Sequence, residues 1–229
     1  MRAVAAAGQR VRPSDAMGTP ASQTAPRRFR VSPRVPLRGE VDEAARIAAV
    51  PAGLTTKGMY FAHFVARLDE AQIRAVWPKL VAPPRHGTYQ PFFDYPFSDV
   101  LRWLHAVARK AHPSSSLLEA LRLFGRDTVR VFLESNVGRV IKGIGVAGPR
   151  ESLLRMPEMW KITDPNNTVS AVEPEPGAVR FDVDGFPGWI DCGLIGTLEQ
   201  VVMNHAVEPT IDVQLDAATR GSFVVHWKR

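Results

Sequence analysis

The chain's only cysteine, Cys192, lies among four glycines in the stretch GFPGWIDCGLIGTLEQVVMN, residues 185–204. This pattern has the outline of two kinds of active site: a thiol nucleophile at a sharp turn, and a glycine-rich loop that binds a phosphate. A catalytic thiol needs a nearby base and normally a lowered pKa. Here the adjacent charge is an acid, Asp191, and His205 follows more than three helical turns later. The sequence therefore favours a small core cysteine over a nucleophile.

A phosphate-binding loop would need partners that the same stretch lacks. In a Walker A loop the second glycine is followed by a lysine and a hydroxyl residue, but Gly193 is followed by Leu194 and Ile195. The Rossmann fingerprint requires its first glycine at the position where Asp191 stands. Turn formation and close backbone packing explain the glycines, so we predict no nucleotide site here.

The six histidines are scattered along the chain, and none stands in a metal-binding motif. His105 and His112 lie seven residues apart, whereas paired metal ligands on a helix are usually four apart. A single helical histidine such as His105 can ligate a haem iron, but a hydrogen-bonded or surface histidine is the commoner case. No serine stands in a G-x-S-x-G motif. We therefore predict no catalytic residue, no metal and no cofactor, with haem disfavoured, in a protein that is not an enzyme.

The positive charge is concentrated at the N-terminus. Residues 1–39 hold eight arginines and one acid, a net charge of +7, which leaves −1 of the total of +6 for residues 40–229. Residues 1–52 are rich in Pro, Ala and Arg and poor in large apolar side chains, so we predict a disordered basic tail. Neither a signal peptide nor a membrane-spanning run is evident, so a cytoplasmic protein is expected.

Residues 53–229 are predicted to form a single α+β domain. Apolar residues at helical spacing predict five helices, over residues 57–68, 69–80, 96–113, 114–148 and 149–160. Ser98 is the expected N-cap of the third of these, and residues 41–50 could add a short helix before Pro51. Alternating patterns then predict a β-hairpin, a helix over 188–205 and two more strands, over residues 167–175, 178–184, 209–217 and 221–229. The order, five helices and then β-β-α-β-β, predicts helices on one face of a small antiparallel sheet.

Aromatic side chains are numerous enough to line an apolar pocket. The candidate lining residues are Tyr95, Trp103, Trp160, Trp189 and Cys192. The alternative is that these side chains fill the core, which is the more common fate of apolar residues.

Several segments resemble a paralogous family of unknown function that is expanded in myxobacteria. The resemblance covers about residues 54–229 and is clearest at Phe124-Gly125-Arg126 and Val137-Gly138-Arg139. That family is similar in fold to the haem-nitric-oxide-binding and vinyl-reductase-like (V4R) sensor domains and to the transport-particle scaffold subunits. The resemblance therefore implies the α+β order given above. It implies no enzymatic activity, and the Tyr-x-Ser-x-Arg triplet that holds the haem propionates in the haem branch does not occur in this sequence.

A complete fold without a catalytic motif predicts a regulatory or sensory domain that binds a small apolar ligand or a protein partner. The alternative is a scaffold or dimerisation module resembling the transport-particle subunits. A protein partner or a second copy of the chain is therefore expected. Nucleic acid or an anionic membrane would be contacted only through the basic tail.

Overall fold

The computed structural model describes residues 39–84, 87–134, 148–163, 167–186, 190–217 and 219–228. The predicted tail up to residue 38, Trp189, and the segment 135–147 at the end of the predicted 114–148 helix lie outside the described residues. The Val137-Gly138-Arg139 motif lies in that segment.

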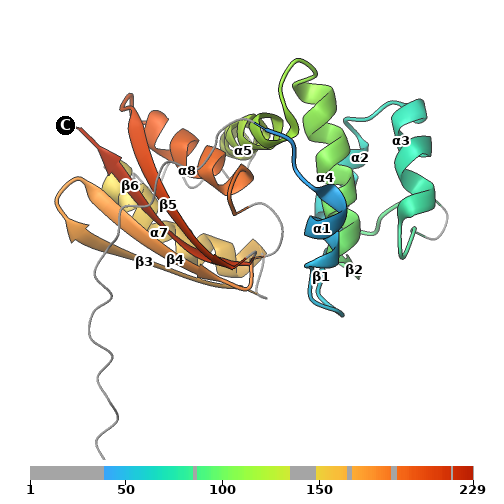
Figure 1. The fold of residues 1–229 in the computed structure, drawn as a ribbon, viewed down its shortest axis with the longest axis horizontal. Helices are drawn as coiled ribbons and strands as arrows, with labels where there is room; N and C mark the ends of the chain where they lie inside the picture. The colour runs from blue at the N-terminus through green and yellow to red at the C-terminus, as the bar shows by residue number, and fades with distance from the viewer. Residues whose placement is uncertain are drawn as a thin grey trace, which may run out of the picture. The chain divides into compact units, whose positions relative to one another are not determined.

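The N-terminal half of the described chain is mainly helical (Figure 1). In chain order its elements are α1 (Glu43–Ala48), β1 (Thr55–Lys57), α2 (Gly58–Val65), α3 (Glu70–Val76), the 3-10 turn η1 (Trp77–Lys79), β2 (Asp94–Pro96), α4 (Phe97–Ala111) and α5 (Leu117–Glu134). The helices predicted within 57–134 are present, because each carries an apolar stripe at helical spacing.

The C-terminal half contains the main sheet. Its elements are α7 (Pro149–Thr163), β3 (Thr168–Glu175), β4 (Ala178–Asp184), α8 (Gly193–Met203), β5 (Pro209–Ala217) and β6 (Arg220–Trp227). The four strands are antiparallel in the order β3-β4-β6-β5, so the two hairpins meet where β4 pairs with β6, with Phe181 opposite Phe223. The helices α7 and α8 pack against this sheet and against each other. The predicted β-β-α-β-β order and the α+β class are confirmed.

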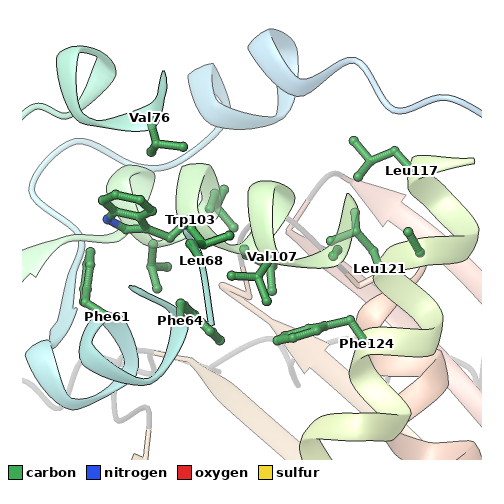
Figure 2. Packing of buried hydrophobic residues seen from close by; sticks show 14 of the residues in the cluster. Phe61, Phe64, Leu68, Val76, Trp103, Val107, Leu117, Leu121 and Phe124 are labelled. Carbon is green, nitrogen blue, oxygen red and sulfur yellow. The ribbon is translucent and has the colours of Figure 1, made fainter. Parts of the chain in front are cut away.

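Two apolar clusters form the core. The first lies among α2, α4 and α5, where Phe124 points from α5 towards Val107 on α4 and its ring meets Phe64 edge-on, with 5.7 Å between centroids (Figure 2). The second lies between the sheet and α8, with Phe181, Phe223 and Leu198 fully buried. Each such side chain stabilises the fold by roughly 1.5–3 kcal/mol.

A close crossing of α5 and α8 joins the two clusters. A Cβ added at Gly125 would overlap the carbonyl oxygen of Gly193, and one added at Gly196 would overlap that of Arg122. Beside this contact the buried carboxylate of Glu199 accepts hydrogen bonds from Arg122 Nε at 2.9 Å and Arg126 Nε at 3.0 Å. Close backbone packing was one predicted reason for the glycines near Cys192, and for Gly196 it is confirmed.

The structure corrects the predictions at the start of the domain. Folded structure begins before residue 53, because α1 lies inside the segment 1–52 that we predicted to be disordered. The partly buried side chains of Val41, Ile47 and Val50 anchor α1 by packing against the first cluster. The short helix that residues 41–50 could form is therefore present, and what the sequence analysis missed is that it packs onto the domain.

Two features around β2 were also not predicted. The strands β1 and β2 pair as an antiparallel ribbon, with Thr56 opposite Tyr95. Three-residue strands are too short to show the alternating pattern that would predict them. Ser98 is not the N-cap of α4. The N-cap is Pro96, with no side-chain hydrogen bond, and the amide of Phe97 donates instead to the carbonyl of Leu54.

Candidate functional site

Charged side chains from three separate elements meet beneath α1. We call this group the α1 cluster; it consists of Glu43 and Arg46 on α1, His105 and Arg109 on α4, and Asp191 and Cys192 just before α8. Two of its members, His105 and Cys192, were candidate functional residues from the sequence. The structure places both against the same short helix.

Arg46 connects α1 to the start of α8. Its Nη1 and Nη2 donate to the two carboxylate oxygens of Asp191 at 2.7 and 2.8 Å, a bidentate pair. Nη1 also lies 3.6 Å from the Sγ atom of Cys192. Burial and the charge of Asp191 raise the pKa of Cys192 to about 12, although Arg46 opposes them. At neutral pH Cys192 is therefore a protonated thiol with 1% of its surface exposed.

Glu43 connects α1 to α4. Its Oε1 accepts a hydrogen bond from Arg109 Nη2 at 2.9 Å, and its Oε2 lies 3.1 Å from His105 Nδ1. His105 is 2% exposed, and neither Nδ1 nor Nε2 makes a hydrogen bond of good geometry among the described residues. Burial lowers the pKa of His105 to about 4, with Glu43 opposing and the charges of Arg46 and Arg109 assisting. At neutral pH the imidazole is therefore uncharged.

A groove of about 400 Å³ runs beside the α1 cluster. It is lined by Ile47, Val50, Pro51, Ala52, Gly53, Leu54, Thr55, Val81, Pro96, Ser98 and Arg102. Most of these side chains are apolar, and Arg102 supplies the single charge. The guanidinium of Arg102 donates to Asp99 at 2.9 Å, and this buried carboxylate also accepts from the amides of Val81 and Ala82, each at 2.9 Å. The cation at the groove wall is therefore fixed in position.

The predicted pocket residues lie elsewhere, and none of the four that are described lines this groove. Tyr95 and Trp103 belong to an aromatic group in the first cluster. Within it, Phe61 stacks on Tyr89 with 4.5 Å between ring centroids, and Trp103 Nε1 donates to Tyr89 Oη at 2.8 Å. Cys192 packs in the same cluster. These side chains fill the core in the way that the alternative interpretation described.

Trp160 lies in the other cluster, half-buried, with its ring 6.0 Å from that of Phe186. The four described candidate residues therefore lie in two different apolar clusters. Sequence reasoning missed the groove and the partners of Arg46. The available signal was Glu43 and Arg46, three residues apart in a segment that also holds Ile47 and Val50.

Most of the described histidines have a partner side chain close to one ring nitrogen. Four have side-chain partners, which are Glu43 for His105, Asp127 for His112, Ser152 for His205 and Asp212 for His226. The fifth, His63, is on the exposed side of α2. Among the described residues there is also no group of three or more His, Cys, Asp or Glu side chains placed to hold a metal ion.

None of the described helices is long and apolar enough to cross a membrane.

Among solved structures, the chain is similar to the Fe(II) unliganded H-NOX protein from K. algicida. The two share 16% identity over 76% of this chain and 97% of that chain, with a TM-score of 0.56. It is also similar to an oxygen-binding H-NOX domain related to soluble guanylate cyclases, with 15% identity over 75% and 93% of the two chains and a TM-score of 0.54. At such identities the likeness shows the fold alone, and it confirms the expected fold group.

No curated protein matches the chain. A family model does match, over residues 50–228, and its description is "Protein of unknown function (DUF2378)". The match starts just after α1 and runs through β6. The chain thus belongs to this family of unknown function, as its resemblance predicted, and the family's fold is H-NOX-like in this member.

Proposed function

We propose that the protein is a non-enzymatic sensory or regulatory domain that binds a small apolar ligand or a protein partner. The groove beside α1 is the observation that carries the ligand form of the proposal. Its volume of about 400 Å³ is within the range of roughly 300–1,000 Å³ that is usual for small-molecule sites. Apolar walls suit a small apolar molecule, and the guanidinium of Arg102, which is paired with Asp99, offers hydrogen-bond donors to a polar end.

A role without catalysis is supported by the chemistry of the α1 cluster. A thiol with a pKa of about 12 is a poor nucleophile at neutral pH, and a base is needed to activate it. At neutral pH the ring of His105, whose pKa is near 4, is uncharged, so it cannot act as a cationic general acid. We also propose that no haem is bound, which is supported by the missing Tyr-x-Ser-x-Arg triplet.

Native mass spectrometry of the purified protein, together with its absorption spectrum, tests this proposal. We expect a co-purified small molecule and no haem absorption band. Val50→Trp places a large ring in the groove and should remove the bound mass, because Val50 is one of its lining residues. Val172→Trp is the matched control, since Val172 is 53% exposed on β3. A bound mass that persists in Val50→Trp, or a haem band, would contradict the proposal.

A scaffold or dimerisation module is the second candidate, and a separate observation favours it. Phe92 and Phe93, directly before β2, are 83% and 67% exposed. Neighbouring aromatic side chains at this exposure are typical of contact surfaces between proteins. Contact with nucleic acid or an anionic membrane is proposed only for the basic N-terminal segment.

A further inference from the structure

The helix α1 has little intrinsic stability. It has six residues, none of them fully buried, whereas isolated helices shorter than about 12 residues are marginal in water. Its own cap is the side chain of Asp42, which accepts from the amide of Ala45 at 2.9 Å. The helix is therefore held in place by what it contacts.

Those contacts are mostly electrostatic and lie at both ends. Glu43 and Glu40 pair with Arg109 on α4 at 2.9 and 3.3 Å, and Arg46 pairs with Asp191 before α8. These groups are partly exposed, with 39% of the Glu43 side chain and 15% of the Arg46 side chain accessible. The pairs of Glu40 and Glu43 with Arg109 are exposed enough to stabilise weakly and to be screened by salt. The bidentate Arg46–Asp191 pair is mostly buried, so salt screens it less.

Three apolar side chains supply the rest of the anchoring. Val41, Ile47 and Val50 pack against the first cluster but remain only partly buried. Ahead of the helix, Gly39 is tied to the start of α5, where its amide donates to Ser116 Oγ at 2.9 Å and its carbonyl accepts from Leu118 at 3.1 Å. Segments with few buried apolar contacts open locally before the rest of a protein unfolds.

The segment covers two features. Arg46 lies against the thiol of Cys192, with Nη1 3.6 Å from Sγ. Ile47 and Val50 form part of the wall of the groove. Moving residues 39–50 away would therefore uncover the thiol and open one side of the groove together.

We propose that residues 39–50 form a detachable strap, closed by the ion pairs of Glu43 and Arg46 and opened while both apolar clusters stay folded. Opening exposes Cys192 and widens the groove, so ionic conditions or a charged partner that competes for these ion pairs controls access to both. The strap opens in this way whether or not the groove binds a ligand.

Thiol labelling of the full chain tests the strap, because Cys192 is its only cysteine. The informative variant is Glu43→Gln, which weakens the ion pairs on α4 and touches no atom of Cys192. We expect the labelling rate to rise about threefold to tenfold, as is reasonable for the loss of a few partly exposed ion pairs. Raising NaCl from roughly 0.05 to 0.5 M should accelerate labelling of the unmodified protein and accelerate the variant less.

Glu70→Gln is the matched control. Glu70 is also in the first turn of a short helix, α3, and pairs with Arg74 at 3.0 Å, but it makes no contact with α1. Its labelling rate should equal that of the unmodified protein. Hydrogen exchange should also be faster in residues 39–50 than in α5.

Two results would overturn the proposal. One is an unchanged labelling rate in Glu43→Gln. The other is a labelling rate that depends on urea as steeply as global unfolding does, because the thiol would then be uncovered only when the whole domain unfolds.

Discussion

His105 is a buried imidazole that the fold keeps uncharged. Its pKa is about 4 in the folded protein and is ordinarily about 6.5, so the unfolded chain binds more protons between these two pH values. The free energy of unfolding should therefore fall as the pH decreases from 6.5 to 4, by about 3 kcal/mol at the lower end. Burial also opposes the charge of Glu43, but its partners hold its pKa below the usual value, so acid weakens that contact as well.

We predict that His105→Leu removes most of this acid sensitivity. Because Nε2 has no partner among the described residues, an apolar side chain of similar size should leave stability at pH 7 within about 1 kcal/mol. Urea unfolding at pH 7, 6, 5 and 4 measures the effect. Val172→Leu on β3, an exposed site without a titratable side chain, is the control and should keep the wild-type pH slope. If His105→Leu keeps that slope too, the acid sensitivity belongs to other groups.

Only part of the residue-scale arrangement can be predicted from sequence. The acid beside Cys192 correctly indicated a raised thiol pKa, because Asp191 is a direct neighbour in the chain. The partner of that acid, Arg46, is 145 residues away, and no local pattern links them. The same holds for Glu43 and His105. Contacts of this kind follow from the packing of α1, α4 and α8, which must be known first.

At the scale of elements, α5 and α8 can cross so closely because Gly125 and Gly196 have no side chain at the contact. We predict that Gly125→Ala destabilises the protein by about 1–3 kcal/mol or more, because its Cβ would meet the carbonyl oxygen of Gly193 and two backbones would have to separate. The midpoint of urea unfolding measures this. Gly148→Ala is the matched control, since a Cβ there would have no heavy atom within 4 Å. Equal midpoints for the two variants would show that the crossing adapts without cost.

Helices and strands with a sustained apolar period were predictable, and those without one were not. α4 carries Leu101, Leu104 and Val107 on one face, and β4 alternates buried Val179 and Phe181 with more exposed residues. β1 and β2 have three residues each, which is too few to show an alternating pattern. The start of α4 was misplaced for a related reason: its first amide finds its partner in Leu54, a residue distant in sequence, so no capping side chain is needed.

At the scale of the whole molecule, the exposed rings of Phe92 and Phe93 are the candidate surface for contact with a second protein molecule. The carbonyl of Phe93 accepts from the amide of Gly58 at 2.9 Å, so the backbone that carries the exposed rings is fixed to the start of α2. Rings presented on fixed backbone lose little entropy when a partner covers them. A stable interface buries more than about 1,000 Å² in total, so the rings would form the centre of a larger contact.

The second candidate function therefore predicts self-association through this surface. Sedimentation of the unmodified protein at about 100 µM should show a dimer, and the double variant Phe92→Ser with Phe93→Ser should sediment as a monomer, because loss of a central aromatic pair typically costs more than 2 kcal/mol of binding. Leu215→Ser, at a residue 44% exposed on β5, removes a comparable apolar side chain from the main sheet and should leave the dimer intact. A monomer in the unmodified protein would exclude self-association and leave these rings to a different protein, whereas a dimer that survives the double variant would place the interface on another face.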